Sequence, residues 1–331
     1  MYVKSRLFDE VAMISVVVVN WNGKPLLADC LSSLRSQTFP DFEVVVVDNG
    51  SVDGSGEWIR ENFPDFKLVQ LDENRGFAGG NNAGISKSRG EWIALLNNDA
   101  AAQPDWLERL HAAVEGQEGV GLAASQVILT SGALDSAGDG MTIAGVPYKR
   151  GHGSLPTGIF LKRTEVFGAS GCGVLLRRSM LERIGLLDED FFCIYEDGDL
   201  NFRARLAGFN CIYVPEAILV HRLHGTLGHL SKDYVFYGQR NMEYLYFKNM
   251  PTRLFWKYLP VHFLSNLLGL AYFTWRGCPL YFIRAKTAFI RDLRRTLEKR
   301  RQVQTLRKLN DGVIEGMLDR RWLRPRLAGK L

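Results

Sequence analysis

Carboxylate and amide side chains follow two of the most apolar stretches of the chain. Val44–Val47 leads into Asp48, and Trp92–Leu96 leads through two asparagines into Asp99. Apolar runs of this length are typical of strands in a parallel sheet, whose carboxyl ends share one edge. Ligands of open α/β sheets bind at that edge, where a carboxylate can hold a divalent cation against a diphosphate. The sequence therefore predicts a site for an anionic, cation-bound ligand.

A second acidic group, Glu196, Asp197 and Asp199, opens a predicted helix that runs through Leu206. A helix N-terminus stabilises negative charge, so simple capping is one interpretation. Capping needs only one acid, whereas three lie here within four positions. The other interpretation is that one of them acts as a general base on a bound substrate.

Strands and helices alternate through the first part of the chain. Strands are predicted at 14–19, 42–48, 67–71 and 92–96, each followed by a helix. Repeated βαβ units with short loops predict a doubly wound α/β sheet. A further strand is predicted at 120–124, and the Gly- and Ser-rich sequence after it is expected to be irregular as far as Ser154.

Charge and composition set the surroundings of this sheet. The 331 residues are 46% hydrophobic, which is enough for a full core, and the five cysteines have no disulfide or metal-ligand spacing. From residue 240 onward there are 20 Lys and Arg against 6 Asp and Glu, whereas 21 against 30 precede it. We expect a reduced, cytoplasmic protein with an acidic globular part and a basic tail.

The basic tail predicts a membrane surface as a partner. Phe255–Trp275 is rich in Leu, Phe, Tyr and Trp but is broken by polar residues and a proline, and a basic helix is predicted at Arg284–Arg301. This pattern fits an interfacial segment on anionic lipid. A packed helical subdomain or an oligomer interface is the alternative, and nucleic acid is not expected. The predicted domains are 1–235 and 236–331.

Several of these motifs occur in one order: Val16–Asn22, the turn 48–54, Asn74–Asn82, Asn97–Asp99, Glu196-Asp197 and His221. In this order they resemble the family 2 glycosyltransferases, in particular their rhamnosyltransferase-like branch. The resemblance covers roughly residues 12–230. It implies a GT-A fold, a Rossmann-like doubly wound mixed sheet, here with a C-terminal helical extension. It also implies inverting transfer of a sugar from a nucleotide sugar, with a divalent cation at the diphosphate.

The same resemblance assigns donor-binding roles by position. Asp48 is expected to bind the nucleoside, and the glycine-asparagine segment is expected to approach the donor. The positions carried over are Asn22, Asp48, Asn49, Asp53, Arg75, Gly76, Gly79, Asn82, Asn97 and Asn98. For Asn49 and Asp53, ordinary turn formation is the alternative.

The metal ligands implied by the resemblance are Asp99 and His221. The family motif has an acid at its first position, whereas this chain has Asn97, so Asp99 must supply the charge. His224 lies three residues after His221 and could replace it. Mixed oxygen and nitrogen ligands favour Mg²⁺ or Mn²⁺.

The resemblance places the general base at Asp197, with Glu196 as the second choice. No Gln-x-x-Arg-Trp motif follows it, so one sugar per encounter is expected. The predicted donor is a dTDP- or UDP-sugar, with dTDP-rhamnose suggested by resemblance, and the predicted acceptor is a lipid-linked saccharide at the inner face of the cell membrane. A homo-oligomer, a sugar nucleotidyltransferase and a catalytically silent nucleotide-sugar-binding module stay open.

Overall fold

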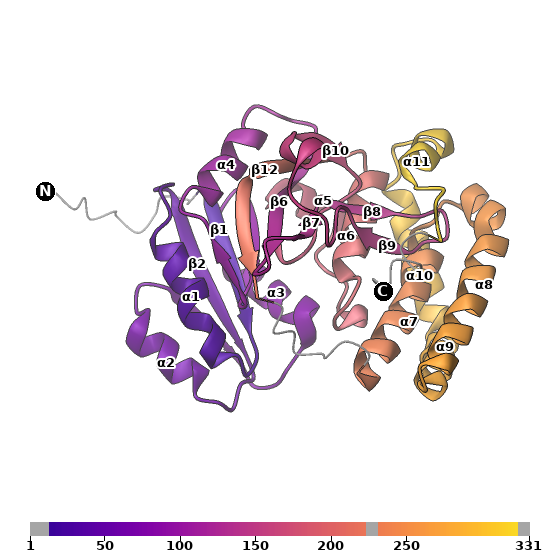
Figure 1. Ribbon diagram of the computed structural model, residues 1–331, viewed down its shortest axis with the longest axis horizontal. Coiled ribbons are helices and arrows are strands. Elements are labelled where there is room, and N and C mark those ends of the chain that lie inside the picture. The colour runs from indigo at the N-terminus through magenta and orange to yellow at the C-terminus, as the bar shows by residue number, and fades with distance from the viewer. Residues whose placement is uncertain (1–12, 223–230, 324–331) are drawn as a thin grey trace, which may run out of the picture.

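A mixed sheet of ten strands forms the centre of the protein in a computed structural model that describes residues 13–222 and 231–323 (Figure 1). The strand order is β10-β12-β6-β11-β4-β1-β2-β3, with β5 paired to β12 and β7 paired to β6. The bounds are β1 Ile14–Asn20, β2 Phe42–Asn49, β3 Lys67–Leu71, β4 Trp92–Asn97, β5 Ala100–Ala102, β6 Val120–Leu129, β7 Leu134–Ala137, β10 Thr164–Val166, β11 Gly173–Arg177 and β12 Asn210–His221. Strands β3, β2, β1 and β4 are parallel, and β11 runs antiparallel to β4 and β6.

Helices cover both faces of the sheet because the central strands are apolar on both sides. Val16 and Val18 of β1 join one buried cluster, and Val17 between them joins the other. The first cluster packs under α1, α2 and α4, and the second packs under α3, α5 and α6. The bounds are α1 Lys24–Arg35, α2 Ser55–Asn62, α3 Gly76–Lys87, α4 Trp106–Val114, α5 Arg178–Ile184 and α6 Glu196–Leu206. The predicted α/β sheet is confirmed.

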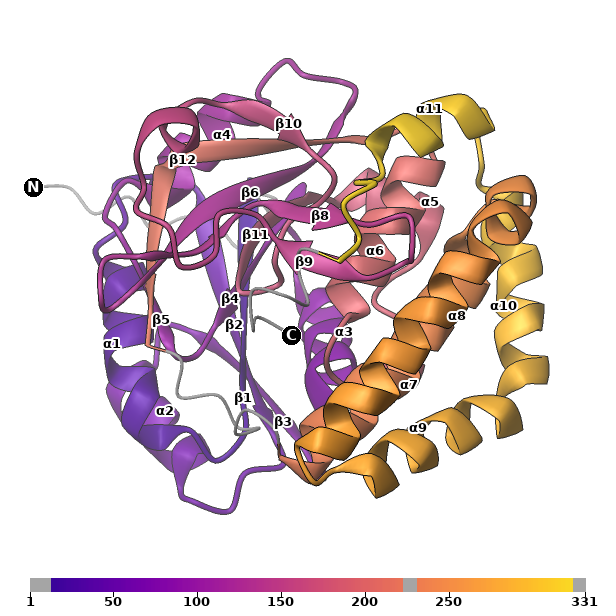
Figure 2. The ribbon, with the colours of Figure 1, turned by 45° about the vertical axis from the view of Figure 1, so that its right-hand side comes forward.

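The rest of the chain forms a group of helices beside α6 (Figure 2). Their bounds are α7 Lys232–Asn249, α8 Thr252–Trp275, α9 Pro279–Arg291, α10 Leu293–Thr305 and α11 Asp311–Met317. A third buried cluster joins Phe202 of α6 to Leu245 of α7 and Phe289 of α9. No helix in the part of the chain that the structure describes has the length and apolar character needed to cross a bilayer.

Two expectations from the sequence differ from the structure. The segment expected to be irregular after residue 124 continues β6 to Leu129 and then forms β7 and the small sheet of β8 (Asp139–Met141) and β9 (Pro147–Lys149). Strands of three or four residues are too short to show a clear alternation. The short 3₁₀ helices η1 (Gly158–Leu161) and η2 (Glu189–Phe191) complete the elements.

The other difference lies in the basic tail. The segment whose apolar sequence is interrupted by polar residues is part of one continuous helix, α8, which contains Pro260. Pro260 lies on the exposed side, where a carbonyl that loses its helical partner can be hydrated. The single basic helix predicted at 284–301 is two helices, because α9 ends at Arg291 and α10 begins at Leu293. The predicted domain boundary at 235/236 lies within the first turns of α7 and stays a prediction.

Candidate active site

The carboxyl ends of β1, β2 and β4 lie in register at one edge of the sheet. Asn20 pairs with Asp48, and Val19 of the same strand pairs with Asn97. The polar residues that end these strands are therefore neighbours, as parallel strands require. The Asn98 amide donates to the Asn20 side chain across 2.8 Å, which ties the loop after β4 to the end of β1.

The turn after β2 is built by Asp48 and Asn22. Asp48 is buried, and its Oδ1 accepts from the Ser51 amide at 3.2 Å. Asn22 has a positive φ of 50°, and its Oδ1 accepts from the Val52 amide at 2.8 Å. Its own amide donates to Ser51 Oγ at 2.9 Å. These bonds hold the turn between the ends of β1 and β2.

Asp53 and Asn49 bind the backbone of this edge. The Asp53 carboxylate accepts from the amide of Lys24 at 3.0 Å and of Ser55 at 3.1 Å, so it satisfies the first backbone N–H of both α1 and α2. Burial opposes ionisation of Asp53, but these bonds and the Ser55 hydroxyl lower its pKa overall. Asn49 bonds Asn74 and the backbone around it through both ends of its amide. Asp53 therefore acts as a turn former through its bond to Ser55, whereas Asn49 joins the end of β2 to the segment that begins α3.

The glycine-asparagine segment begins α3 and contacts the loop that contains Glu189. Arg75 pairs with Glu189 at 2.9 Å, and the Asn82 amide donates to the same carboxylate at 3.0 Å. A Cβ at Gly79 would lie 2.7 Å from Arg75 Cβ, and a Cβ at Gly76 would collide with the carbonyl of Phe192. These glycines therefore allow close packing of protein on protein, and their approach to a donor stays a prediction.

His221 lies between two carboxylates at the end of β12. Its Nε2 is 3.1 Å from Asp99 Oδ1, and its Nδ1 is 2.9 Å from Asp135 Oδ2. Strand β5 creates this meeting, because it follows Asp99 directly and pairs Ala100 with His221. Burial would lower the pKa of His221, but Cys172, Asp135 and Asp99 around it raise the pKa to about 12.

Asp135 is the residue of this group that the sequence did not reveal. It lies on β7, in the segment expected to be irregular, so no periodicity pointed to it. Its side chain is fully buried and accepts from Lys149 Nζ at 2.8 and 2.9 Å, in addition to His221. Burial alone would raise its pKa, but His152, His221 and Lys149 lower it far below the usual range. A carboxylate on the far nitrogen of a histidine fixes the orientation of the ring.

The three acids at the start of α6 have different surroundings. Glu196 is buried, its Oε2 has no hydrogen-bond partner among the residues that the structure describes, and burial together with Asp197 raises its pKa well above the usual range. Asp199 is fully buried and paired with Arg203 at 2.9 Å and Lys248 at 2.7 Å. Only Asp197 is partly exposed.

Asp197 is joined to the edge of the sheet through a short backbone path. Its Oδ2 accepts from the Gly171 amide at 2.9 Å, and the next residue, Cys172, accepts from the Asn97 amide at 3.0 Å. Half-buried Asp139 of β8 lies close by, and burial together with the charge of Asp197 raises the pKa of Asp139 to about 7. The sequence did not indicate Asp139, which lies in the same short-strand segment as Asp135.

The structure thus brings Asp48, Asn97, Asp99, His221 and Asp197 to one region. Within the described ranges, no set of three or more His, Cys, Asp or Glu side chains is arranged to hold a metal ion. The oxygen of Asp99 and the nitrogen of His221 face each other, and both are ligand types that Mn²⁺ and Mg²⁺ accept. His224, the predicted substitute, lies outside the described residues.

Comparison with known proteins gives one family. The sequence model of glycosyl transferase family 2 matches residues 15–185. An uncharacterized protein of Sinorhizobium fredii is 29% identical over 66% of this chain, and an O-antigen biosynthesis protein of Myxococcus xanthus is 30% identical over 62% of it. The aligned part spans only 25% and 17% of those two relatives. The N-acetylglucosaminyl-diphospho-decaprenol L-rhamnosyltransferase of Mycobacterium tuberculosis is 26% identical over 69% of this chain and 85% of its own length.

Solved structures share the fold. GalNAc-T7 with UDP, GalNAc and Mn²⁺ aligns with a TM-score of 0.57 at 15% identity, over 72% of this chain and 48% of that one. The mannosyltransferase PcManGT from Pyrobaculum calidifontis, with GDP-Man and Mn²⁺, aligns with a TM-score of 0.50 at 19% identity, over 86% of this chain and 88% of that one.

Proposed function

The chain belongs to glycosyl transferase family 2, and on that premise we propose that it moves one sugar from a nucleotide diphosphate sugar to a hydroxyl of a saccharide acceptor. The proposal rests on one observation, which is that three polar groups lie around the same edge of the sheet. Buried Asp48, the Asp99–His221 pair and partly exposed Asp197 lie around one edge of the sheet. They supply a nucleoside contact, a diphosphate site and a base.

The diphosphate end of the donor is assigned to Asp99 and His221. A bound Mg²⁺ or Mn²⁺ would be held by these two side chains and would neutralise charge on the departing diphosphate. Asp135 orients His221 by binding Nδ1, which directs Nε2 towards Asp99. Two structural neighbours contain Mn²⁺, which supports this choice of cation.

Asp197 is proposed as the base of an inverting transfer. The acceptor oxygen attacks the anomeric carbon from the face opposite the diphosphate, and its proton passes to Asp197. The bond from the anomeric carbon to the phosphate oxygen breaks, and its electron pair leaves with the nucleoside diphosphate. Asp199 is already paired with two cations and Glu196 is buried, so Asp197 fits the role best among the three acids.

A membrane surface is the proposed location of the acceptor. Helix α8 buries one side, including Leu254 and His262, and exposes a stripe on the other side that contains Trp256, Phe263 and Leu267. On neighbouring α9, exposed Ile283 and Ile290 each precede an exposed arginine. Apolar side chains beside cationic ones fit the interface of an anionic bilayer.

The finer substrate assignment follows one relative. The Mycobacterium tuberculosis protein is named for L-rhamnosyl transfer to a diphospho-decaprenol-linked sugar. By that likeness we propose a dTDP-rhamnose donor and a lipid-linked saccharide acceptor in polysaccharide synthesis, with the protein peripheral at the inner face of the membrane.

A donor panel tests the proposal. The purified protein is incubated with dTDP-, UDP- and GDP-sugars, with Mn²⁺, Mg²⁺ or a chelator, and with or without a membrane-lipid extract. We expect nucleoside diphosphate release from one donor, dependent on the cation and increased by lipid. Binding of nucleotide without release from any donor would support the silent binding module instead.

A further inference from the structure

The backbone immediately before the proposed base is held in an unfavourable conformation. Phe192, Ile194 and Tyr195 have φ values of 61°, 69° and 72°, although none is glycine. Left-handed backbone is costly for such residues, above all for a β-branched one such as Ile194. It persists only where the surrounding structure fixes it. Something outside this segment must therefore hold it.

Helix α7 provides that hold through one buried side chain. Asn241 is fully buried, and its Nδ2 lies 2.9 Å from the carbonyl oxygen of Phe191 and 2.7 Å from those of Cys193 and Ile194. Its Oδ1 accepts from Arg240 Nε at 3.0 Å. A single amide thus gathers the carbonyls of three peptide groups within four residues.

The same segment is also held by contacts of Phe192 with α3 and with the start of α7. The carbonyl of Phe192 accepts from the Ala78 amide of α3 at 3.2 Å. The Phe192 ring stacks on Tyr237 of α7, with ring centres 5.2 Å apart. The segment therefore joins α3, the helix that contains Gly76 and Gly79, to α7, and Asp197 comes two residues after it.

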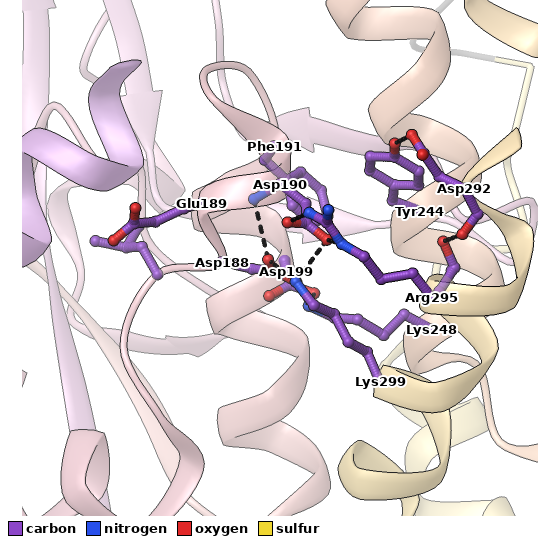
Figure 3. A network of polar contacts seen from close by, with 12 residues as sticks. Asp188, Glu189, Asp190, Phe191, Asp199, Tyr244, Lys248, Asp292, Arg295 and Lys299 are labelled. Atoms are coloured by element: carbon purple, nitrogen blue, oxygen red, sulfur yellow. Dashed lines mark hydrogen bonds and ion pairs between the residues drawn. The ribbon is translucent and has the colours of Figure 1, made fainter. Parts of the chain in front are cut away.

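Ion pairs fix the residues just upstream (Figure 3). Asp188 contacts Lys248 of α7 and Lys299 of α10, each at 2.5 Å, and Asp190 contacts Lys299 at 2.6 Å. Arg240 Nη2 also donates to the carbonyl of Asp190 at 2.7 Å. These contacts anchor the approach to the segment, while Asn241 bonds the strained peptides themselves.

We propose that Asn241 is a positioning residue for the transfer reaction. By holding the carbonyls of 191, 193 and 194, it keeps the left-handed backbone that places Asp197 beside Gly171 at the sheet edge. This inference rests on the proposed function, because it takes Asp197 as the base. It makes α7 part of the catalytic machinery without any contact between Asn241 and substrate.

The test compares N241D with a matched variant of the same helix. Aspartate has the shape of asparagine but donates no hydrogen bond and places an oxygen against three carbonyls. E243Q is the control, because buried Glu243 lies two residues along α7 and bonds His262 and Lys286 on α8 and α9. If N241D does not fold, N241S replaces it.

At temperatures where both proteins are folded, N241D should lower kcat by about tenfold to a hundredfold, because a displacement near 1 Å is enough for such a loss. The donor KM and nucleotide Kd should stay within about twofold of wild type, and E243Q should keep its kcat. Amides 192–198 should exchange hydrogen faster in N241D and not in E243Q. Adding I194G, where glycine accepts the positive φ, should restore part of the lost rate.

The inference is overturned if N241D keeps its kcat, if amides 192–198 exchange at the wild-type rate, or if kcat and nucleotide binding fall together. Loss of kcat without rescue by I194G would also count against it, since a general packing defect gives that result. If wild-type protein transfers no sugar, the proposed function fails. Hydrogen exchange still decides whether Asn241 holds the segment.

Discussion

The two ring nitrogens of His221 face two carboxylates of different roles. Asp99 faces Nε2, where a cation would bind, and Asp135 faces Nδ1 from β7. The second contact places an additional acid, Asp135, near the predicted cation site, where the chain has Asn97 instead of the acid of the family motif. Asp135 does not replace that acid as a ligand, because it binds the opposite side of the ring.

Replacing Asp135 by asparagine should weaken cation-dependent nucleotide binding by about tenfold to a hundredfold, the usual effect of losing an orienting carboxylate. Titration calorimetry of nucleoside diphosphate with Mn²⁺ or Mg²⁺ measures this directly. D105N, at the partly exposed N-cap position of α4, is the control and should bind as wild type does. Unchanged affinity in D135N would contradict the role of Asp135.

The individual residues were predicted unevenly. The order of the motifs pointed to Asp48, Asp99, Asp197 and His221. The structure places these residues around one edge of the sheet. Asp135 and Asp139 lie on strands of three or four residues in Gly- and Ser-rich sequence, where neither motif nor periodicity marks them. Asp199 is paired with Lys248 of α7, which is distant in sequence, so no local pattern shows that this acid is already occupied.

At the scale of elements, α6, α7 and α10 are joined by a buried ionic cluster (Figure 3). Lys248 is nearly buried and bridges Asp188 at 2.5 Å and Asp199 at 2.7 Å. Burial alone would raise the pKa of Asp188, but Lys248 and Lys299 lower it to about 2. The folded state therefore holds this proton less tightly than the unfolded chain does. The resulting stability is present above about pH 4 and lost as the pH falls towards 2.

Replacing Lys248 by methionine leaves two buried carboxylates without this cation, so K248M should lose about 3–5 kcal/mol of unfolding free energy at pH 7. The loss should shrink as the pH falls and the carboxylates become protonated. Urea unfolding of both proteins between pH 3 and pH 7 measures it. R294M on α10 removes an exposed pair with Glu298 and should cost less than about 1 kcal/mol. A constant K248M loss across this range would contradict the cluster.

The central elements were predictable because long apolar runs indicate buried strands, and apolar residues at helical spacing indicate helices. The prediction that residues 125–154 are irregular was wrong, because β7, β8 and β9 are too short to show an alternating pattern in the sequence. The single basic helix predicted at 284–301 was wrong because the chain turns at Asp292, between α9 and α10. Both errors concern where an element ends.

At the scale of the whole molecule, helices α8 and α9 lie on the side of the molecule away from β1 and β2 (Figure 1). Their exposed side chains include apolar and basic residues. Truncating the tail would uncover the buried cluster that joins α6 to α7 and α9. Substitutions on the exposed stripe therefore test membrane binding more cleanly than a deletion.

The double variant W256S/F263S should bind anionic phospholipid vesicles at least about tenfold more weakly than wild type. Each wild-type side chain would bury an apolar area in the bilayer that stabilises binding by more than about 1 kcal/mol, and serine lacks this area. Cosedimentation with vesicles of 30% anionic lipid measures it, with neutral vesicles and high salt as further conditions. V52S, an exposed apolar site on the sheet domain, is the control. Equal binding of the double variant and V52S would show that this face does not contact lipid.

The most direct test of the whole account compares D197N with E196Q in sugar transfer, using the donor that wild-type protein consumes. D197N should lower kcat by about a hundredfold to ten-thousandfold while nucleotide affinity stays the same, as removal of a general base does. E196Q should keep most of the rate, because Glu196 is buried and burial disfavours its charged form. Full activity of D197N, or loss of transfer in E196Q alone, would contradict the assignment of Asp197 as the base.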